Sequence, residues 1–203
     1  MKVDLEDIAF WMDAIRNSKD RYRTLESFWK GQLRSKVWLV EKLEEMIGTY
    51  YNPVKLVIHG GWNGVLASLI FNSKINVSHI TSLDIDHKCE EVASTVNKRQ
   101  EMEGRFTAVT RDMTIYDYDA DVVINTSCEH LTNGAYYRWL DLVPDNALIV
   151  LQSNNYFDLE EHISCVNDLD EFKKWSGIEV LWGDTLELPK YNRFMLIGKK
   201  KIV

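Results

Sequence analysis

From residue 54 onward, short apolar segments alternate with segments of helical character, and this alternation limits the fold more than any other feature. Seven segments are short and rich in β-branched and other apolar residues, as buried strands are: 54–59, 78–84, 106–110, 121–125, 147–152, 178–182 and 193–197. Four intervening segments have helical character: 65–71, 87–102, 133–142 and 169–175. The alternation predicts an α/β fold with a parallel sheet covered by helices on both faces. Because no helix separates the last two strands, we expect them to form an antiparallel hairpin at one edge.

The N-terminal quarter of the chain has a different pattern, with apolar residues at helical spacing. Leu5, Ile8, Met12 and Ile15 share one face of a helix, and the same period runs from Tyr22 to Leu43. Residues 17–20 divide the two helical segments, and Gly48 and Pro53 are expected to end the second one. We therefore expect residues 1–50 to form a helical extension that packs on one α/β domain, residues 51–203.

The composition is that of an ordinary folded protein. With 45% hydrophobic and 27% charged residues among 203, it excludes a disordered or low-complexity chain. No run approaches the roughly 18 apolar residues of a membrane span. The first ten residues carry acids where a secretory signal carries bases and a long apolar run. We expect a soluble, cytoplasmic protein without a membrane partner; the composition does not indicate its oligomeric state.

The net charge of −7, from 31 acids and 24 bases, disfavours nucleic acid as the main partner because it repels phosphate backbones. Residues 16–36 are a local exception, with seven bases against two acids: Arg16, Lys19, Arg21, Arg23, Lys30, Arg34 and Lys36 against Asp20 and Glu26. This segment is either a solvated helix face or a docking surface for an anionic partner, including nucleic acid.

The cysteines and histidines do not follow a known disulfide or metal-binding pattern. The three cysteines are odd in number and form no CxxC motif, and none of the five histidines forms HxH or HxxxH. The sequence therefore predicts neither a disulfide framework nor a metal site.

A glycine-rich turn, Gly60-Gly61-Trp62-Asn63-Gly64, follows the first predicted strand. Small residues let a ligand approach the backbone, and the helix that follows offers free N–H groups. The turn lacks the GxGxxG of a dinucleotide fold and the Gly-Lys-Ser/Thr of a phosphate loop. It is either a nucleotide or carboxylate site or an ordinary tight turn.

Two acids stand where predicted strands end. Asp84 ends the second strand about twenty residues after the turn, where an acid can accept two hydrogen bonds from a ribose diol. Asp86 suits the cap of the following helix better. Asp112 follows the third strand; it could accept from the exocyclic amine of a base on which Met113 packs, or it could simply be an acid in a turn.

Polar residues also follow the fourth and fifth predicted strands. In the run Asn125–His130, Glu129 and His130 form an adjacent acid–histidine pair that could supply a general base, since histidine titrates near neutral pH. The alternative is helix capping by Thr126 or Ser127 with Glu129 in the first turn. Residues 152–157, with His162 nearby, are either a substrate pocket or a polar loop.

Together these features resemble the class I S-adenosylmethionine-dependent methyltransferases over residues 54–198. The matching elements are the glycine turn 60–64 as the first motif, residues 82–86 with the second-strand acid, residues 111–113 as the third and residues 121–125 as the fourth. The resemblance implies a Rossmann-like, seven-stranded, mostly parallel sheet with one antiparallel edge strand. The run 125–130 is also reminiscent of methyltransferase-like proteins from bacteriophages.

The resemblance implies S-adenosylmethionine as cofactor and names the residues that would contact it. Gly60 and Gly64 would face the methionine part, Asp84 the ribose, and Asp112 with Met113 the adenine. Further cofactor residues would be Gly61, Trp62 and Asn125. Glu129 or His130 would be the catalytic base toward a small-molecule acceptor.

The chain also departs from the family pattern. Ile58 or His59 stands where the family has an acid, and Trp62 replaces the middle glycine. No Asn/Asp-Pro-Pro-aromatic or Pro-Cys motif of DNA methyltransferases is present. The weakened turn keeps open a non-catalytic protein that uses this fold for binding or structure, and a nicotinamide or nucleotide-sugar enzyme on a related sheet is a third possibility.

Overall fold

The computed structural model describes residues 2–48 and 52–201. The chain forms two compact units, residues 1–111 and 112–203. The boundary expected between residues 50 and 51 falls at residues outside the described part, and the N-terminal helices belong to the same unit as the first three strands. The extension as a separate part therefore stays a prediction.

The first unit is built on three parallel strands with the order β3-β2-β1. The strands are β1 (Val54–His59), β2 (Val77–Asp84) and β3 (Phe106–Thr110), and the helices between them are α4 (Val65–Phe71), α5 (Lys88–Val96) and α6 (Lys98–Met102). β1 ends in four consecutive buried residues, 56–59, as a strand covered on both faces does. The single helix expected over 87–102 is two helices that meet at Asn97, whose amide donates to the carbonyl oxygens of Gly64 and Ala93.

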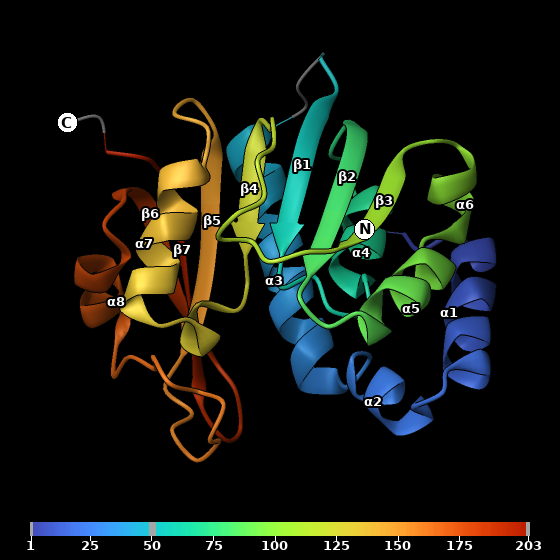
Figure 1. Ribbon diagram of the computed structural model, residues 1–203, viewed down its shortest axis with the longest axis horizontal. Helices are drawn as coiled ribbons and strands as arrows, with labels where there is room; N and C mark the ends of the chain where they lie inside the picture. The colour runs from blue at the N-terminus through green and yellow to red at the C-terminus, as the bar shows by residue number, and fades with distance from the viewer. Residues whose placement is uncertain (1, 49–51, 202–203) are drawn as a thin grey trace. The chain divides into compact units, whose positions relative to one another are not determined.

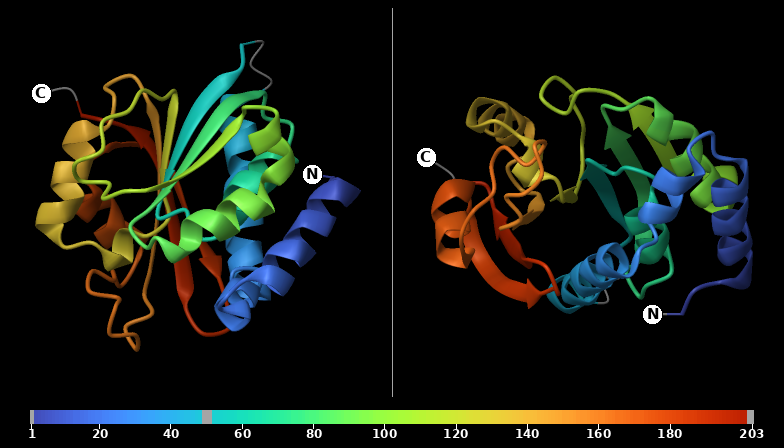
Figure 2. Two further views of the ribbon diagram at one scale, coloured as in Figure 1. Left: turned by 45° about the vertical axis from the view of Figure 1, so that its right-hand side comes forward. Right: turned by 90° about the horizontal axis from the view of Figure 1, so that it is seen from below.

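Three helices precede β1: α1 (Leu5–Asn17), α2 (Arg21–Glu26) and α3 (Lys30–Ile47). The break after α1 is where the sequence predicts it, but the helix expected from Tyr22 to Leu43 is interrupted at residues 27–29. α1 contacts α5 and α6, and α3 contacts α4 (Figures 1 and 2). The N-terminal helices thus pack against the other helices of the first unit, to which they belong.

The buried face of α1 is not the apolar face that the spacing predicts. Leu5 is 79% exposed and Met12 is 53% exposed, whereas Asp7 and Ala14 are buried. Asp7 is a residue of α1 whose carboxylate accepts two hydrogen bonds from Arg99 of α6, at 2.8 and 2.9 Å. A buried ion pair therefore takes part in docking α1, which an apolar periodicity cannot reveal.

The second unit contains β4 (Val122–Asn125), β5 (Leu148–Asn154), β6 (Glu179–Glu187) and β7 (Asn192–Lys199). Its helices are η1 (Cys128–His130), a 3₁₀ turn, with α7 (Asn133–Leu142) and α8 (Leu169–Ser176). β4 and β5 are parallel, whereas β7 is antiparallel to both β5 and β6. The hairpin predicted for the last two strands is confirmed. α7 meets α8 through Tyr136, whose ring is tilted against that of Trp175 with centroids 4.1 Å apart and whose hydroxyl donates to the Ser176 carbonyl oxygen at 2.6 Å.

The strand order is β3-β2-β1-β4-β5-β7-β6 in a seven-stranded sheet. The predicted fold class, an α/β fold with a mostly parallel sheet and an antiparallel edge hairpin, is confirmed. Among the described residues, no helix has both the length and the apolar character that crossing a membrane requires.

Candidate functional site

The glycine turn follows β1 directly, and two of its glycines are fixed by packing. A Cβ on Gly61 would lie 2.0 Å from Ser82 Oγ of β2. Gly64 has a φ of +71°, and a Cβ there would lie 3.0 Å from Ala93 of α5. The turn is therefore held tightly against β2 and α5, so the need for glycine at these two positions has a structural cause.

Asp84 connects the end of β2 to this turn. Its Oδ2 accepts from the Trp62 N–H at 2.9 Å, and its Oδ1 accepts from the Asp86 N–H at 3.0 Å. The carboxylate is half-buried, and each oxygen retains a lone pair because a carboxylate oxygen can accept two hydrogen bonds. The acid and the glycine turn, 22 residues apart, thus form one structural feature of the first unit.

Asp86 lies at the start of α5, one residue before the N-cap residue His87. Its Oδ1 accepts from the Lys88 N–H at the start of α5, and its Oδ2 forms an ion pair with Arg23 at 2.6 Å. The hydrogen bond from the Lys88 N–H and the pairing with Arg23 lower the pKa of Asp86. Arg23, one of the bases of the 16–36 segment, is therefore used within the unit.

The two departures from the family pattern lie at the end of β1 and in the turn. Trp62 has a φ of +49°, the left-handed region where a glycine fits without strain. Its ring lies 5.9 Å from the Lys36 ammonium, a cation–π contact.

His59 is fully buried, and burial lowers its pKa to about 3, so its imidazole is neutral at physiological pH. His59 cannot replace an acid as the partner of an ammonium group.

In the second unit, the predicted cofactor residues Asp112, Met113 and Asn125 are engaged locally. Asp112 Oδ1 accepts from both the backbone N–H and the hydroxyl of Thr114, each at 2.8 Å, as a turn acid does. Asn125 is fully buried; its amide contacts Met113 Sδ at 3.6 Å and accepts from the Ser127 N–H at 3.0 Å. These bonds bring Met113 and Asn125 together and leave the predicted cofactor contacts of all three as predictions.

Glu129 lies on η1 and is buried, with 3% of its surface exposed. Its Oε1 accepts from Asn154 Nδ2 at 2.7 Å and from Arg193 Nη1 at 2.5 Å. Ser127, one of the two capping candidates, is the N-cap residue of η1 but makes no side-chain capping bond, and Glu129 lies in the first turn of this helix. Glu129 is an ion-paired carboxylate. Sequence reasoning missed both partners, since Arg193 is 64 residues away on β7.

His130 and His162 meet beside Glu129. Their rings lie 4.8 Å apart in an edge-to-face arrangement. His130 Nδ1 lies 2.9 Å from the Glu161 carbonyl oxygen, and His162 Nδ1 lies 2.8 Å from the Tyr156 carbonyl oxygen. The ligand atoms of Glu129, His130 and His162 lie within 4.8 Å of one another. No sequence motif indicates this cluster, because the two histidines are 32 positions apart.

The run expected to leave β5 at Gln152 remains in the strand. β5 continues to Asn154, and Gln152, Ser153 and Asn154 are each at most 2% exposed. These side chains are therefore buried in the fold instead of forming a polar loop. Beyond the strand, Tyr156 stacks on Tyr191 with ring centroids 5.4 Å apart.

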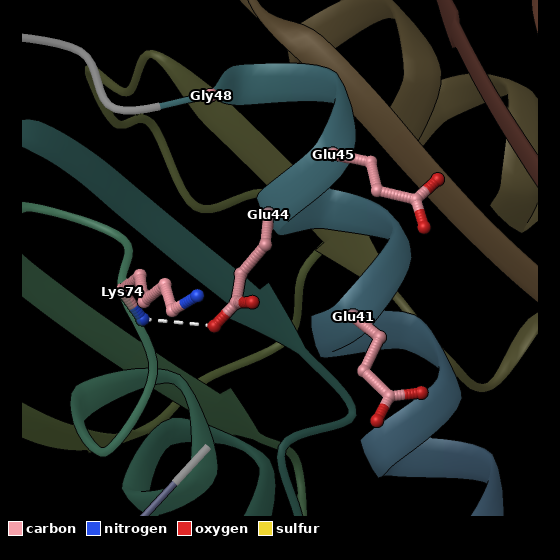
Figure 3. Close-up of a pocket in the computed structure, with 5 residues that line it drawn as sticks. All are labelled: Glu41, Glu44, Glu45, Gly48 and Lys74. Carbon is pink, nitrogen blue, oxygen red and sulfur yellow. Dashed lines mark hydrogen bonds between the residues drawn. The ribbon is translucent and has the colours of Figure 1, made fainter.

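A surface pocket in the first unit lies away from the predicted cofactor residues. It is lined by Glu41, Glu44, Glu45 and Gly48 from the end of α3, and by Lys74, whose N–H donates to Glu44 Oε1 at 2.8 Å (Figure 3). None of the glycine turn or Asp84 lines it. Three glutamates, of which Glu41 and Glu45 are exposed, and one lysine are typical of a solvated helix end.

No family model matches the sequence, and no curated protein matches it either. Solved structures do match. Magnesium protoporphyrin IX methyltransferase (ChlM) from Synechocystis PCC 6803, with bound SAH, is 12% identical with a TM-score of 0.67, covering 97% of this chain and 95% of that one. N-methyltransferase NodS from Bradyrhizobium japonicum WM9 is 9% identical with a TM-score of 0.62, covering 82% and 95%. The [4+2]-cyclase SpnF is 10% identical with a TM-score of 0.65, covering 82% of each chain.

At these identities the likeness shows the fold. The chain has the Rossmann-like fold of solved class I methyltransferases, and the order and directions of its strands agree with that fold. The same fold is present in SpnF, which is described as a cyclase, so function has to be argued from the residues of this chain. The similar structures give no support to the bacteriophage-type likeness.

Proposed function

We propose that the protein is a methyltransferase that binds S-adenosylmethionine and methylates a small-molecule acceptor. The observation that carries the proposal is the Asp84 carboxylate, which ends β2, accepts from the Trp62 N–H of the glycine turn and keeps lone pairs on both oxygens. In open α/β sheets, ligands bind outside the carboxyl ends of the strands. An acid there can accept hydrogen bonds from the two hydroxyls of a ribose, and the adjacent turn can face the polar methionine part of the cofactor.

The cofactor roles follow the resemblance residue by residue. Gly60 and Gly64 are proposed to face the methionine part and Asp84 the ribose, with Gly61 and Trp62 as further cofactor residues of the turn. From the second unit, Asp112 with Met113 is proposed for the adenine, with Asn125 as a supporting residue. Since His59 is neutral, the methionine ammonium would need another acceptor, and the carbonyl groups of the turn are the candidates.

Methyl transfer is a direct displacement, which the protein assists mainly by alignment. A lone pair of the acceptor oxygen or nitrogen forms a bond to the methyl carbon while the carbon–sulfur bond breaks, leaving S-adenosylhomocysteine. A protonated acceptor also loses a proton. Glu129 and His130 are proposed to activate the acceptor, since they follow the carboxyl end of β4 and His130 is exposed. With Nδ1 at the Glu161 carbonyl, Nε2 is the nitrogen of His130 that can take the proton.

Asp84→Ala tests the proposal, with Asp86→Ala as the matched control two residues away. Hydrogen bonds to a charged group contribute about 1.5–3 kcal/mol each, so Asp84→Ala should weaken S-adenosylhomocysteine binding at least tenfold. Asp86→Ala should affect binding less and stability more, because Asp86 holds Arg23 and the start of α5. Calorimetric titration measures the affinity, and urea denaturation measures the free energy of unfolding.

Two outcomes would contradict the proposal. A larger affinity loss for Asp86→Ala would mean that the two acids are assigned the wrong way round. Tight binding of NAD with no binding of S-adenosylhomocysteine would favour a nicotinamide enzyme. A protein that binds S-adenosylhomocysteine but methylates none of a broad panel of acceptors would instead support a binding or structural role for the fold.

A further inference from the structure

The cluster of Glu129, His130 and His162 in the second unit has the composition and geometry of a metal site. The ligand atoms of the three residues lie within 4.8 Å of one another. Bonds from a transition-metal ion to nitrogen or oxygen are about 2.0–2.2 Å, so two ligands of one ion are at most about 4.4 Å apart. Side-chain rotations that move these atoms by an ångström or less would allow all three to bind one ion.

Both histidines are held in the tautomer that a metal ligand needs. A carbonyl oxygen can only accept a hydrogen bond, so the contacts of 2.9 Å at His130 Nδ1 and 2.8 Å at His162 Nδ1 place the proton on Nδ1. The Nε2 atom of each neutral ring then carries the lone pair. Metal-binding histidines commonly donate their other N–H to a carbonyl or carboxylate in this way.

Glu129 would be the third metal ligand, and one of its carboxylate oxygens is an independent indication that a cation binds here. Its Oε1 is occupied by Asn154 and Arg193, whereas its Oε2 is buried and has no hydrogen-bond partner among the described residues. A buried carboxylate oxygen without a partner is costly. A cation bound at Oε2 would remove that cost, while Asn154 and Arg193 keep the carboxylate oriented.

We propose that Glu129, His130 and His162 bind one divalent transition-metal ion of the Zn²⁺ or Fe²⁺ type. Two imidazoles and one carboxylate suit such ions better than Mg²⁺ or Ca²⁺, which prefer oxygen ligands. The half-buried His162 and the exposed His130 leave the ion a route from solvent. The positive charge of Arg193 opposes a second cation, so we expect micromolar affinity instead of the tight binding of a structural zinc site.

The inference reverses the sequence-based prediction that no metal is bound, and it does not rest on methyl transfer. Three protein ligands leave coordination positions open, as catalytic sites do. An acceptor hydroxyl bound there would lose its proton to solvent more readily. His130 would then activate the acceptor through the ion instead of taking the proton itself.

Zn²⁺ titration of the EDTA-treated full chain tests the proposal, with the variants His130→Asn and His162→Asn. The Asn amide can replace the Nδ1–H donor to the same carbonyl oxygen but is a poor zinc ligand, so it preserves a purely structural role. We expect one Zn²⁺ per chain and at least a tenfold weaker affinity in each variant. His87→Asn, a change at an 81% exposed histidine of the first unit, should leave the affinity unchanged. Co²⁺ should give visible absorption bands that His162→Asn abolishes.

The proposal is overturned if Zn²⁺ does not bind stoichiometrically, or if both Asn variants retain wild-type affinity while remaining folded by circular dichroism. Folding losses are separated by measuring S-adenosylhomocysteine binding on the same samples. A chain that binds Zn²⁺ without binding S-adenosylhomocysteine would confirm the metal site and contradict the proposed cofactor. The opposite result would contradict the metal site alone.

Discussion

His59 is a titratable side chain placed in the core at the end of β1. Burial lowers its pKa to about 3, whereas a histidine in an unfolded chain titrates near 6.5. Between these two values the unfolded state binds the proton and the folded state does not, so the stability falls as the pH falls below about 6.5. At about 1.4 kcal/mol per pH unit, His59 should cost about 2 kcal/mol between pH 7 and pH 5.

His59→Gln checks this pH dependence, because glutamine keeps hydrogen-bonding groups but does not titrate. Urea denaturation at pH 7 and pH 5 should show a loss of stability that is about 2 kcal/mol smaller in the variant than in the wild type. His87→Gln, at an exposed position, should behave as the wild type does. Equal losses in the wild type and His59→Gln would show that His59 is protonated in the folded protein.

The role of a residue could be predicted from the sequence where that role depends only on residues close to it in the chain. Asp86 accepts from the Lys88 N–H at the start of α5, next to the N-cap residue His87, because such bonds depend on neighbours in the chain. Glu129 was singled out by its position after β4, but its ion pair with Arg193 and its contact with Asn154 join three distant segments. No pattern in one sequence shows which strands become neighbours at that point, so the buried ion pair and the histidine cluster could not be found.

Elements were predictable to the extent that their apolar pattern reflects burial. β3 and α4 have the predicted bounds, and α4 is a run of buried residues that ends where polar residues begin. The interruptions at residues 27–29 and at Asn97 were missed because helical spacing continues across both. Polarity also misled at the end of β5, where buried amides extend the strand.

The role of the 16–36 segment is only partly predictable from its charge pattern. It forms α2 and the beginning of α3, and its exposed side chains combine bases with large apolar groups: Arg21, Lys30 and Arg34 with Tyr22, Leu25 and Trp29. Arg23 pairs with Asp86, so the segment is not only a solvated face. Binding of an anionic partner, nucleic acid included, stays a prediction.

The docking of α1 should depend on Asp7. Burial alone would raise the pKa of Asp7, but hydrogen bonds from Arg99, Asn72 and Gln100 lower it below the usual value. Its ionised form therefore stabilises the fold above the unfolded-state pKa, and this contribution is lost only as the pH falls through the lower folded-state value. At pH 7, Asp7→Asn should destabilise the protein by about 2–3 kcal/mol, since it removes the buried negative charge to which Arg99 donates two hydrogen bonds.

Hydrogen exchange of the α1 amides, together with urea denaturation, measures this effect. Protection should fall in α1 before it falls in the strands. Asp13→Asn is the matched control, because Asp13 lies on the same helix but is exposed; surface changes of this kind usually stay within about 0.5 kcal/mol. If the two variants are equally stable, the packing of Trp11 and Ala14 dominates the docking of α1.

At the scale of the whole molecule, cofactor binding should appear as global stabilisation. A ligand at about 100 times its Kd stabilises the folded state by roughly 2.7 kcal/mol if it does not bind the unfolded chain. For a chain of this size each kcal/mol shifts the Tm by about 2–4 °C. Saturating S-adenosylhomocysteine should therefore raise the Tm by roughly 5–10 °C, and NAD at the same concentration should not. Asp84→Ala should lose most of the shift at a fixed ligand concentration because its Kd is higher, whereas Asp86→Ala should melt lower without ligand and keep the shift.

Equal shifts with both ligands would mean that the site holds an adenosine group without recognising the methionine part. No shift with either ligand would remove the basis for methyl transfer and leave the fold as a binding or structural module.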